Sequence, residues 1–266
     1  MLVAGKTVVV TGAGSGMGRE LCLELARRKA AVAGVDLREQ TLEETKKLVE
    51  ALGGKFVSYP MDITDSKAVA ALPGKVEKDL GPADALINNA GIIQKFVKVN
   101  DLDMENAMRV MSVNFDGPLM LIKAFLPGLI ERPEAHLLNV SSMGAYAPVP
   151  GQSVYGASKA AIKLLTEGLR SELMGTSVGV TIVFPGAIAT NIAENSGLDI
   201  PAGAAESSQT KTTAADVAAR EMVDAIEKNK PRITIGSDAK FMDRFSRLNP
   251  VAAANLIYKQ MANLLG

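Results

Sequence analysis

Two side chains that could transfer a proton lie four residues apart, at Tyr155 and Lys159. On a helix this spacing places both side chains on one face, one turn apart. A free tyrosine has a pKa of about 10 and is a poor acid or base at neutral pH, but a neighbouring ammonium group favours the phenolate. We therefore expect Lys159 to lower the pKa of Tyr155 and to make its hydroxyl a general acid or base.

A serine hydroxyl could complete this group. Ser142 lies thirteen residues before Tyr155, beyond a loop that contains Pro148, Pro150 and Gly151. Such a loop can fold the hydroxyl back toward the start of the helix, where it could bind a substrate oxygen. Taken alone, the stretch also fits an ordinary helix with an exposed lysine and a half-buried tyrosine, so the preceding chain must decide.

A glycine-rich loop, TGAGSGMG at residues 11–18, joins a predicted buried strand (residues 6–12) to a helical pattern. Amide groups at a helix start point at an anion, and glycines allow the backbone to come close to it. The spacing is T-G-x-x-x-G-x-G, with Gly12, Gly16 and Gly18, and not the common G-x-G-x-x-G. It predicts a phosphate site, with a purely structural turn as the alternative.

The next predicted strand, residues 30–36, ends in Asp36, eighteen residues beyond Gly18. In dinucleotide-binding folds an acid here binds the adenosine ribose hydroxyls and repels a 2′-phosphate. A solvated carboxylate at a strand end is the alternative, and we favour the binding role because of the upstream loop. Arg38 complicates the choice, since an arginine there could meet a 2′-phosphate.

Composition narrows the class of protein. The chain has 266 residues, 47% of them hydrophobic, and no formal net charge, which argues against a nucleic-acid binder. Its single cysteine, Cys22, and single histidine, His136, argue against a disulfide within the chain, a metal site and a Ser-His triad. We identify no apolar run near the roughly 20 residues of a membrane span and no room for a signal peptide. We therefore expect a cytoplasmic protein, with His136 in a structural role at a strand start.

Strand and helix patterns alternate along the chain, which predicts an α/β fold with a doubly wound parallel sheet covered by helices on both faces. The further predicted strands are 55–62, 83–91, 136–140, 178–186 and 232–236. The further predicted helices are 39–52, 66–80, 103–129, 154–174 and 214–228. We see no interdomain linker, so we expect one domain over residues 1–266.

Four stretches depart from regular patterns. Pro73 and Gly74 should break the helix 66–80 or delay its start. Asn114 within a helix indicates a kink or a buried polar role, which we leave open. Residues 191–213 are too long for a plain connector and suggest a substrate loop or lid. The tail, residues 239–265, is predicted to be helical and interrupted by Pro250, with apolar positions that favour core or subunit contacts over membrane binding.

Six candidates fall at the carboxyl ends of predicted strands, where the ligand crevice of such a sheet lies. They are Gly12, Asp36, Asp62, Asn89, Ser142 and Pro185–Gly186.

These motifs together resemble the short-chain dehydrogenase/reductase family, over essentially the whole chain. The residues that carry the resemblance are TGAGSGMG, NNAG at residues 88–91, Asn114, Ser142, YGASK at residues 155–159 and PGAIAT at residues 185–190. The resemblance implies a single-domain Rossmann-like fold, and Asp36 is similar to the NAD-preferring branch.

The resemblance also implies residue roles. Tyr155 would be the general acid/base, Lys159 would lower its pKa and hold the nicotinamide ribose, and Ser142 would orient the substrate oxygen. Asn114 would bind a water that links Lys159 to solvent. Asn89, Ala90 and Gly91 would line the ribose side or support the sheet. The remaining implied cofactor residues are Gly12, Ser15, Gly16, Met17, Gly18, Asp36, Asp62, Ile63, Pro185, Gly186, Ile188 and Thr190.

The resemblance thus predicts an NAD-dependent oxidoreductase that interconverts a secondary alcohol and a ketone, without a metal. The partner would be a small molecule, and Met143, Ala145, Tyr146 and Pro148 hint that it is apolar. A homodimer or homotetramer is implied by the family alone. Two alternatives stay open: another nicotinamide-dependent reaction, such as that of an epimerase or enoyl reductase, and a non-catalytic dinucleotide sensor or scaffold.

Overall fold

The computed structural model describes residues 1–190, 192, 196 and 212–261. Its strands form one parallel sheet in the order β3-β2-β1-β4-β5-β6-β7. The strands are β1 (Thr7–Thr11), β2 (Ala31–Asp36), β3 (Lys55–Pro60), β4 (Ala85–Asn88), β5 (Ala135–Val140), β6 (Val178–Pro185) and β7 (Arg232–Ile235). The strand order reverses between β1 and β4, and ligands of open α/β sheets bind at such a switch point.

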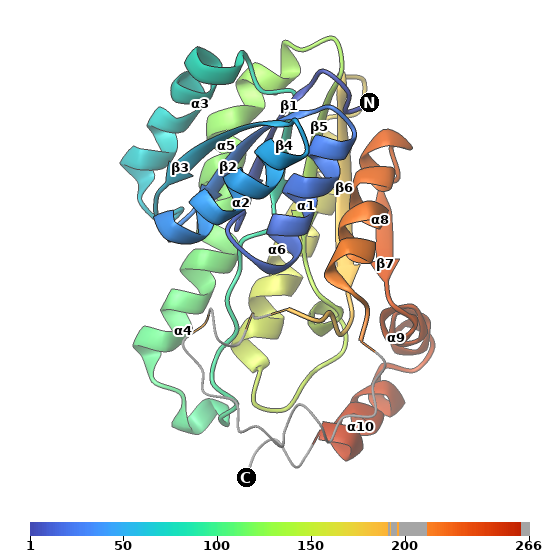
Figure 1. Ribbon diagram of the computed structural model, residues 1–266. Helices are drawn as coiled ribbons and strands as arrows, with labels where there is room; N and C mark the ends of the chain where they lie inside the picture. The colour runs from blue at the N-terminus through green and yellow to red at the C-terminus, as the bar shows by residue number, and fades with distance from the viewer. Residues whose placement is uncertain (191, 193–195, 197–211, 262–266) are drawn as a thin grey trace.

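Helices cover both faces of the sheet (Figure 1), as the alternating pattern predicts. The long helices are α1 (Gly16–Arg27), α2 (Glu39–Ala51), α3 (Ser66–Leu80), α4 (Met104–Met111), α5 (Gly117–Ile130), α6 (Ser153–Glu172), α8 (Ala215–Glu227), α9 (Ser237–Leu248) and α10 (Pro250–Met261). Short helical turns are η1 (Val99–Asp101), η2 (Ser112–Asp116) and η3 (Met143–Ala145).

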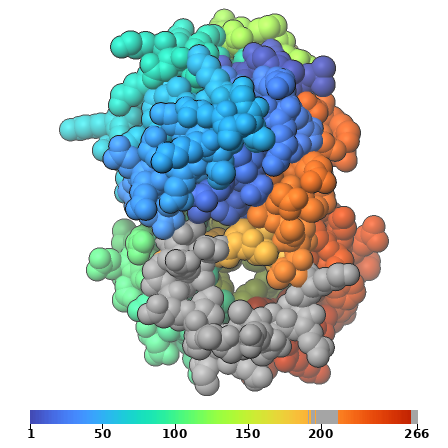
Figure 2. All heavy atoms as spheres, in the orientation of Figure 1, coloured from blue at the N-terminus to red at the C-terminus, as the bar shows by residue number. Residues whose placement is uncertain are grey.

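The two faces of the sheet support two separate apolar cores. In β1 every side chain is buried, and Val8 and Val10 pack with α1, α2 and α8 while Val9 packs with α3 and α5. This alternation follows from the two-residue period of a strand, and burial on both faces is typical of parallel sheets. In Figure 2 the orange surface of α8 adjoins the blue surface of α1, where Arg28 forms ion pairs with Asp224 and Glu227.

The prediction that Pro73 and Gly74 break or delay α3 was wrong, because the helix runs from Ser66 to Leu80 without interruption. Asp65 caps its start by accepting hydrogen bonds from the amides of Lys67 and Ala68. Proline has a φ compatible with a helix and removes one backbone hydrogen bond. Burial of Val69, Leu72 and Val76 against the sheet offsets that loss.

The predicted helix 103–129 is a continuous helical stretch with a π-helical turn, η2, between α4 and α5. By length and composition alone, Met104–Ile130 could cross a membrane, contrary to the expectation that no apolar run approaches that length. The core helix of a globular protein passes the same test. In α5 the side chains of Leu121, Ile122 and Phe125 are buried in the core on one face of the sheet, which supports a core role.

The tail is helical and divided at Pro250, as predicted. Proline suits the first position of a helix, where its missing N–H has no partner to lose. Helices α9 and α10 form a small third core around Ala147, Met242, Ala253 and Ile257. The predicted substrate loop, 191–213, lies almost entirely outside the described residues, as does the end of the tail, 262–266.

Candidate active site

The glycine loop between β1 and α1 has the shape that a phosphate group requires. Gly12 has a φ of +68°, and a side chain there would approach Asn89 Nδ2 to 2.9 Å and Ala90 Cα to 3.0 Å. A side chain on Gly18 would overlap the carbonyl of Gly12. The backbone can therefore take this course only with glycine, and it leads directly into the positive N-terminus of α1.

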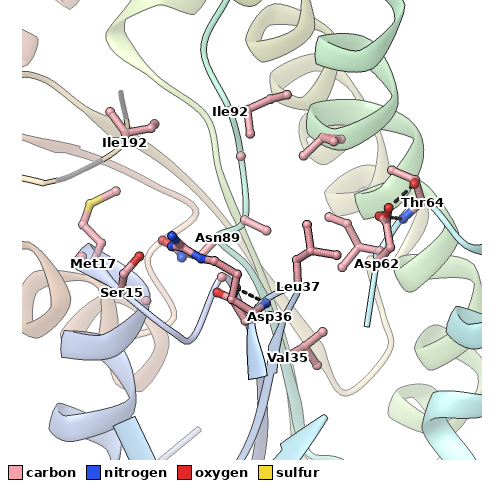
Figure 3. Close-up of a pocket in the computed structure, with 18 of the residues that line it drawn as sticks. Ser15, Met17, Val35, Asp36, Leu37, Asp62, Thr64, Asn89, Ile92 and Ile192 are labelled. Carbon is pink, nitrogen blue, oxygen red and sulfur yellow. Dashed lines mark hydrogen bonds between the residues drawn. The ribbon is translucent and has the colours of Figure 1, made fainter. Parts of the chain in front are cut away.

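A cavity of about 510 Å³ opens at this loop and runs along the carboxyl ends of β1, β2 and β4 (Figure 3). Its lining includes twelve of the predicted cofactor residues: Gly12, Ser15, Gly16, Met17, Gly18, Asp36, Asp62, Ile63, Asn89, Ala90, Gly91 and Thr190. Tyr155, Lys159, Pro185, Gly186 and Ile188 are not among the residues that line it. A lining that includes both the glycine loop and Asp36 is consistent with a dinucleotide.

Residues that we did not predict also line the cavity: Val35, Leu37, Met61, Thr64, Ile92, Arg109, Ser112, Val113 and Ile192. Arg38, considered above for a 2′-phosphate, lines it as well. Helical spacing could have revealed part of this set, because Arg109, Ser112 and Val113 are related by three and four residues.

Two carboxylates line the cavity, Asp36 and Asp62. Asp36 accepts hydrogen bonds from the amides of Gly14 (2.9 Å) and Arg38 (3.1 Å). Asp62 accepts hydrogen bonds from the amide and the hydroxyl of Thr64, both at 2.8 Å. These contacts hold Asp36 beside the glycine loop, where it can accept ribose hydroxyls.

Asn114 lies in η2 and is almost completely buried. Its Oδ1 accepts from the amide of Ile92 (2.9 Å), and its Nδ2 donates to the carbonyl of Ile92 (2.9 Å) and to Ser158 Oγ (3.0 Å). A π-helical turn often marks a functional position. The sequence left two alternatives open for Asn114, a kink in the helix and a buried polar role. The structure has both, because Asn114 is a buried, hydrogen-bonded residue in an irregular turn of the helix.

Lys159 and Asn114 approach the cavity at Gly91, one of the residues that line it. A side chain on Gly91 would lie 3.0 Å from Lys159 Nζ and 3.1 Å from Asn114 Oδ1, so glycine allows the closest approach of these groups. Lys159 Nζ donates to the carbonyl of Val140 at 3.1 Å and lies 5.9 Å from the ring centre of Tyr155. The predicted one-turn relation of Tyr155 and Lys159 on a helix is confirmed by α6.

Ser142 and Tyr155 face each other across Gly144. A side chain on Gly144 would lie 3.4 Å from Tyr155 Cε1 and 3.5 Å from Ser142 Oγ. Ser142 Oγ accepts from the amide of Gly144 at 3.0 Å and hydrogen-bonds the phenol of Tyr155. The loop therefore returns the serine hydroxyl to the tyrosine, as expected.

Burial changes the acid–base balance of this group. It raises the pKa of the Tyr155 phenol, while the hydrogen bond from Ser142 lowers it. Burial also lowers the pKa of Lys159 to about 8. The expectation of a lowered Tyr155 pKa was therefore wrong for the protein alone, because the loss of water around the phenol outweighs the hydrogen bond of Ser142.

The turn after β6 lies on the opposite side of the cavity. The Ala187 amide donates to Asp238 Oδ2 at 2.7 Å, and Ile188 forms an isolated bridge with Thr213. Side chains on Gly186 or Gly236 would overlap the Asp238 carboxylate. The turn is thus fixed by the first residues of α9, and it brings Thr190 next to Gly16.

Three buried side-chain atoms in the described part of the chain have no hydrogen-bond partner: Asn88 Oδ1, Asn89 Oδ1 and Gln152 Oε1. Asn89 otherwise serves the sheet, since its Nδ2 donates to the carbonyl of Thr11 at 2.9 Å. Orphan acceptors at a cavity are suited to a ligand or an ordered water.

Known proteins share both the sequence and the fold. The family model described as short chain dehydrogenase matches residues 6–200. The oxidoreductase SadH of Mycobacterium tuberculosis is 34% identical over 257 residues, which cover 92% of this chain and 91% of SadH. The oxidoreductase EphD of the same organism is 36% identical over 93% of this chain, but the match spans only 44% of EphD.

Solved structures agree in architecture. A short-chain dehydrogenase/reductase from Burkholderia phymatum in complex with NAD matches with a TM-score of 0.82 and 25% identity, over 88% of this chain and 90% of the other. A short chain dehydrogenase from Burkholderia cenocepacia in complex with NADP matches with a TM-score of 0.80 and 28% identity, over 97% and 99%. Similar folds thus bind either nicotinamide dinucleotide.

Proposed function

This chain belongs to the short-chain dehydrogenase family, and we propose that it is an oxidoreductase that interconverts a secondary alcohol and a ketone with NAD. One observation carries the proposal. Tyr155 lies beside Ser142, and Lys159, 5.9 Å from the Tyr155 ring centre, approaches Gly91, which lines the cavity. A binding protein would have no need for a buried lysine beside a buried tyrosine.

The choice of NAD rests on Asp36. Its carboxylate is held at the cavity by two backbone amides, where it would bind the ribose hydroxyls and repel a 2′-phosphate. The proposed cofactor residues are the twelve that line the cavity, together with Tyr155, Lys159, Pro185, Gly186 and Ile188. The bound nicotinamide would accept or supply the hydride, and its oxidised ring carries a positive charge.

The proposed chemistry of the chain is proton transfer at the substrate oxygen. During alcohol oxidation Tyr155, as phenolate, would accept the hydroxyl proton. Ser142 would donate a hydrogen bond to the same oxygen as negative charge develops on it. Lys159 would stabilise the phenolate as an ammonium ion, the form that a pKa of about 8 still favours at neutral pH.

Asn114 has a position consistent with proton delivery. It holds the backbone of Ile92 from both sides, and its Oδ1 lies at Gly91 beside Lys159. A water bound there would link the lysine to solvent, as the resemblance implies.

The substrate is proposed to be apolar. Met143, Tyr146 and Val149 follow Ser142 and pack against the small core of α9 and α10. The Tyr146 hydroxyl is used by the protein itself, donating to the carbonyl of Ala239 at 3.0 Å. The segment after Ser142 is thus apolar in composition, and this supports the proposal of an apolar substrate.

Thermal melts with NADH and NADPH in parallel, followed by a panel of alcohols and ketones, test the proposal. A ligand at a hundredfold excess over Kd stabilises the fold by about 2.7 kcal/mol. We expect the larger rise in Tm with NADH and turnover of at least one apolar alcohol. Nucleotide binding without turnover would favour a sensor or scaffold, and a larger rise with NADPH would reverse the cofactor assignment.

A cytoplasmic location, a dimeric or tetrameric state and the single-domain extent of residues 1–266 stay predictions. Because the match spans less than half of EphD, any role within a longer protein is also a proposal.

A further inference from the structure

Gln94 is a completely buried glutamine in the loop that follows β4. Its side-chain oxygen accepts hydrogen bonds from the backbone amides of Val154 (2.9 Å) and Tyr155 (3.0 Å). Its side-chain nitrogen donates to the carbonyl of Gly151 at 2.7 Å. One amide group therefore makes three hydrogen bonds to the start of helix α6, about sixty residues away in the sequence.

These contacts meet a need of the helix. The first amides of a helix have no partner within it, and a side chain at the N-cap usually satisfies one of them. In α6 the N-cap residue, Gln152, makes no such bond. Gln94 replaces it from another segment, and one of the two amides that it satisfies belongs to Tyr155 itself.

The contact is reciprocal. Gln152 Nε2 donates to the backbone carbonyl of Gln94 at 2.6 Å, and both side chains are buried. Each glutamine therefore fixes the other's backbone segment. Gln94 lies three residues after Gly91 and two after Ile92, which contacts Asn114. The hydrogen bonds of Gln94 and Gln152 thus connect the loop that lines the cavity to α6, the helix that carries Tyr155.

We propose that Gln94 is a positioning residue, which sets the place of Tyr155 relative to the cavity by holding the first turn of α6. The inference rests on the proposed function, since it concerns the geometry of proton transfer. A displacement of a reacting group by about 1 Å can lower a rate on the order of 10²-fold. The hydrogen bonds of Gln94 oppose displacement along and across the helix axis, because they reach two amides and one carbonyl.

The test uses Gln94→Met, which keeps the length of the side chain and removes its hydrogen bonds. Gln152→Met removes only the reciprocal bond and leaves both caps on α6. Gln260→Met, at an exposed glutamine of α10, is the matched control. For each protein, NADH titration gives the number of binding sites and the Kd, and kcat is expressed per binding site so that unfolded protein does not count.

We expect kcat of Gln94→Met to fall on the order of 10²-fold with an unchanged Kd for NADH, a smaller fall for Gln152→Met, and none for Gln260→Met. A purely structural role would lower Tm and the number of binding sites but leave kcat per site at the wild-type value, and that result overturns the inference. If Gln94→Met does not fold, Gln152→Met decides: a lowered kcat supports positioning, and a wild-type kcat refutes it.

Two failures are distinguishable. A wild-type protein without turnover on the whole panel refutes the proposed function, and this inference with it. An active wild type, an inactive Tyr155→Phe and a fully active Gln94→Met refute the inference alone.

Discussion

The amino ends and the carboxyl ends of the parallel strands form two opposite edges of the sheet, here called the amino edge and the carboxyl edge. Both edges bury polar groups, but they differ in how completely those groups are hydrogen-bonded. At the amino edge, Asp84 is 3% exposed and accepts hydrogen bonds from the amide of Thr7 and from Arg132. His136 is 1% exposed and shares a hydrogen bond of 2.8 Å with Thr181. Every one of these groups is matched within the protein.

At the carboxyl edge the matching is incomplete. Lys159 is 4% exposed, and in the described part of the chain it bonds a carbonyl and no carboxylate. The three orphan acceptors, on Asn88, Asn89 and Gln152, belong to the residues that follow or end strands at this edge or cap α6. Buried groups without full compensation cost stability, and of these residues Asn89 lines the cavity, where a ligand could satisfy its orphan oxygen. We therefore expect substitutions at the amino edge to affect stability and substitutions at the carboxyl edge to affect binding or turnover.

The largest expected effect is that of Tyr155→Phe at the carboxyl edge, which should lower turnover and leave stability nearly unchanged. Loss of the proposed general acid/base should lower kcat by roughly 10²–10⁴, while the ring still fills its place. Turnover and thermal melts of the same preparation measure this. Near-normal activity would remove Tyr155 from its assigned role.

Asp84→Asn should give the opposite result at the amino edge. It leaves Arg132 and Lys6 without their common carboxylate partner, and hydrogen bonds to charged groups contribute about 1.5–3 kcal/mol each. We expect a loss of about 2–3 kcal/mol in urea unfolding with unchanged kcat. A large loss of kcat in fully folded protein would contradict the division between the edges.

His136 should make the amino edge sensitive to acid. Burial lowers its folded-state pKa to about 3 from the ordinary value of 6.5. Between these values the unfolded chain binds a proton that the folded chain does not, so stability falls as the pH falls from about 6.5 toward 3. The free energy of unfolding then changes by at most about 1.4 kcal/mol per pH unit. Unfolding of wild type and His136→Gln at pH 7 and pH 5 should show a smaller acid effect in the variant, and equal effects would exclude His136 as the cause.

Asp36→Ala should change cofactor choice more than stability. Removing the carboxylate abolishes its repulsion of a 2′-phosphate, and we expect the ratio of NADPH to NADH affinity to rise about tenfold, or roughly 1.4 kcal/mol. Parallel titrations of both nucleotides measure the ratio. If it does not change, Asp36 acts only as a surface carboxylate.

The smallest effect is expected at Gly128 in α5. A side chain there meets no atom within 4 Å, whereas one on Gly18 would overlap the Gly12 carbonyl. Gly128→Ala should therefore stabilise the fold by about 0.5–1 kcal/mol and leave nucleotide affinity unchanged. Gly18→Ala provides the contrast, because it should abolish nucleotide binding; equal behaviour of the two variants would show that the loop is not a phosphate cradle.

Local patterns explain what the sequence could predict. Strand β1, the glycine loop, Asp36 and the pair Tyr155 and Lys159 follow from periodicity and spacing within short windows. The division of the tail at Pro250 follows from the chemistry of one residue. These features need no knowledge of distant contacts.

The missed features depend on contacts that are remote in sequence or on burial. Gln94 has no motif of its own and is recognised only by its bonds to Val154 and Tyr155. The uninterrupted course of α3 depends on packing against the sheet, which outweighs the local effect of Pro73. The raised pKa of Tyr155 depends on desolvation, which the residue types do not reveal.

The hydrogen bond from the Ala187 amide to Asp238 has a consequence for the order in which the protein is made. Strands β1 to β4 and the glycine loop leave the ribosome before α9 and can begin to fold as they emerge. The turn at Ala187 must wait for its acceptor, which lies fifty-one residues later in the chain. A nascent chain that ends before α9 therefore holds the glycine loop while the turn after β6, which leads to Thr190 at the cavity, still has no fixed position.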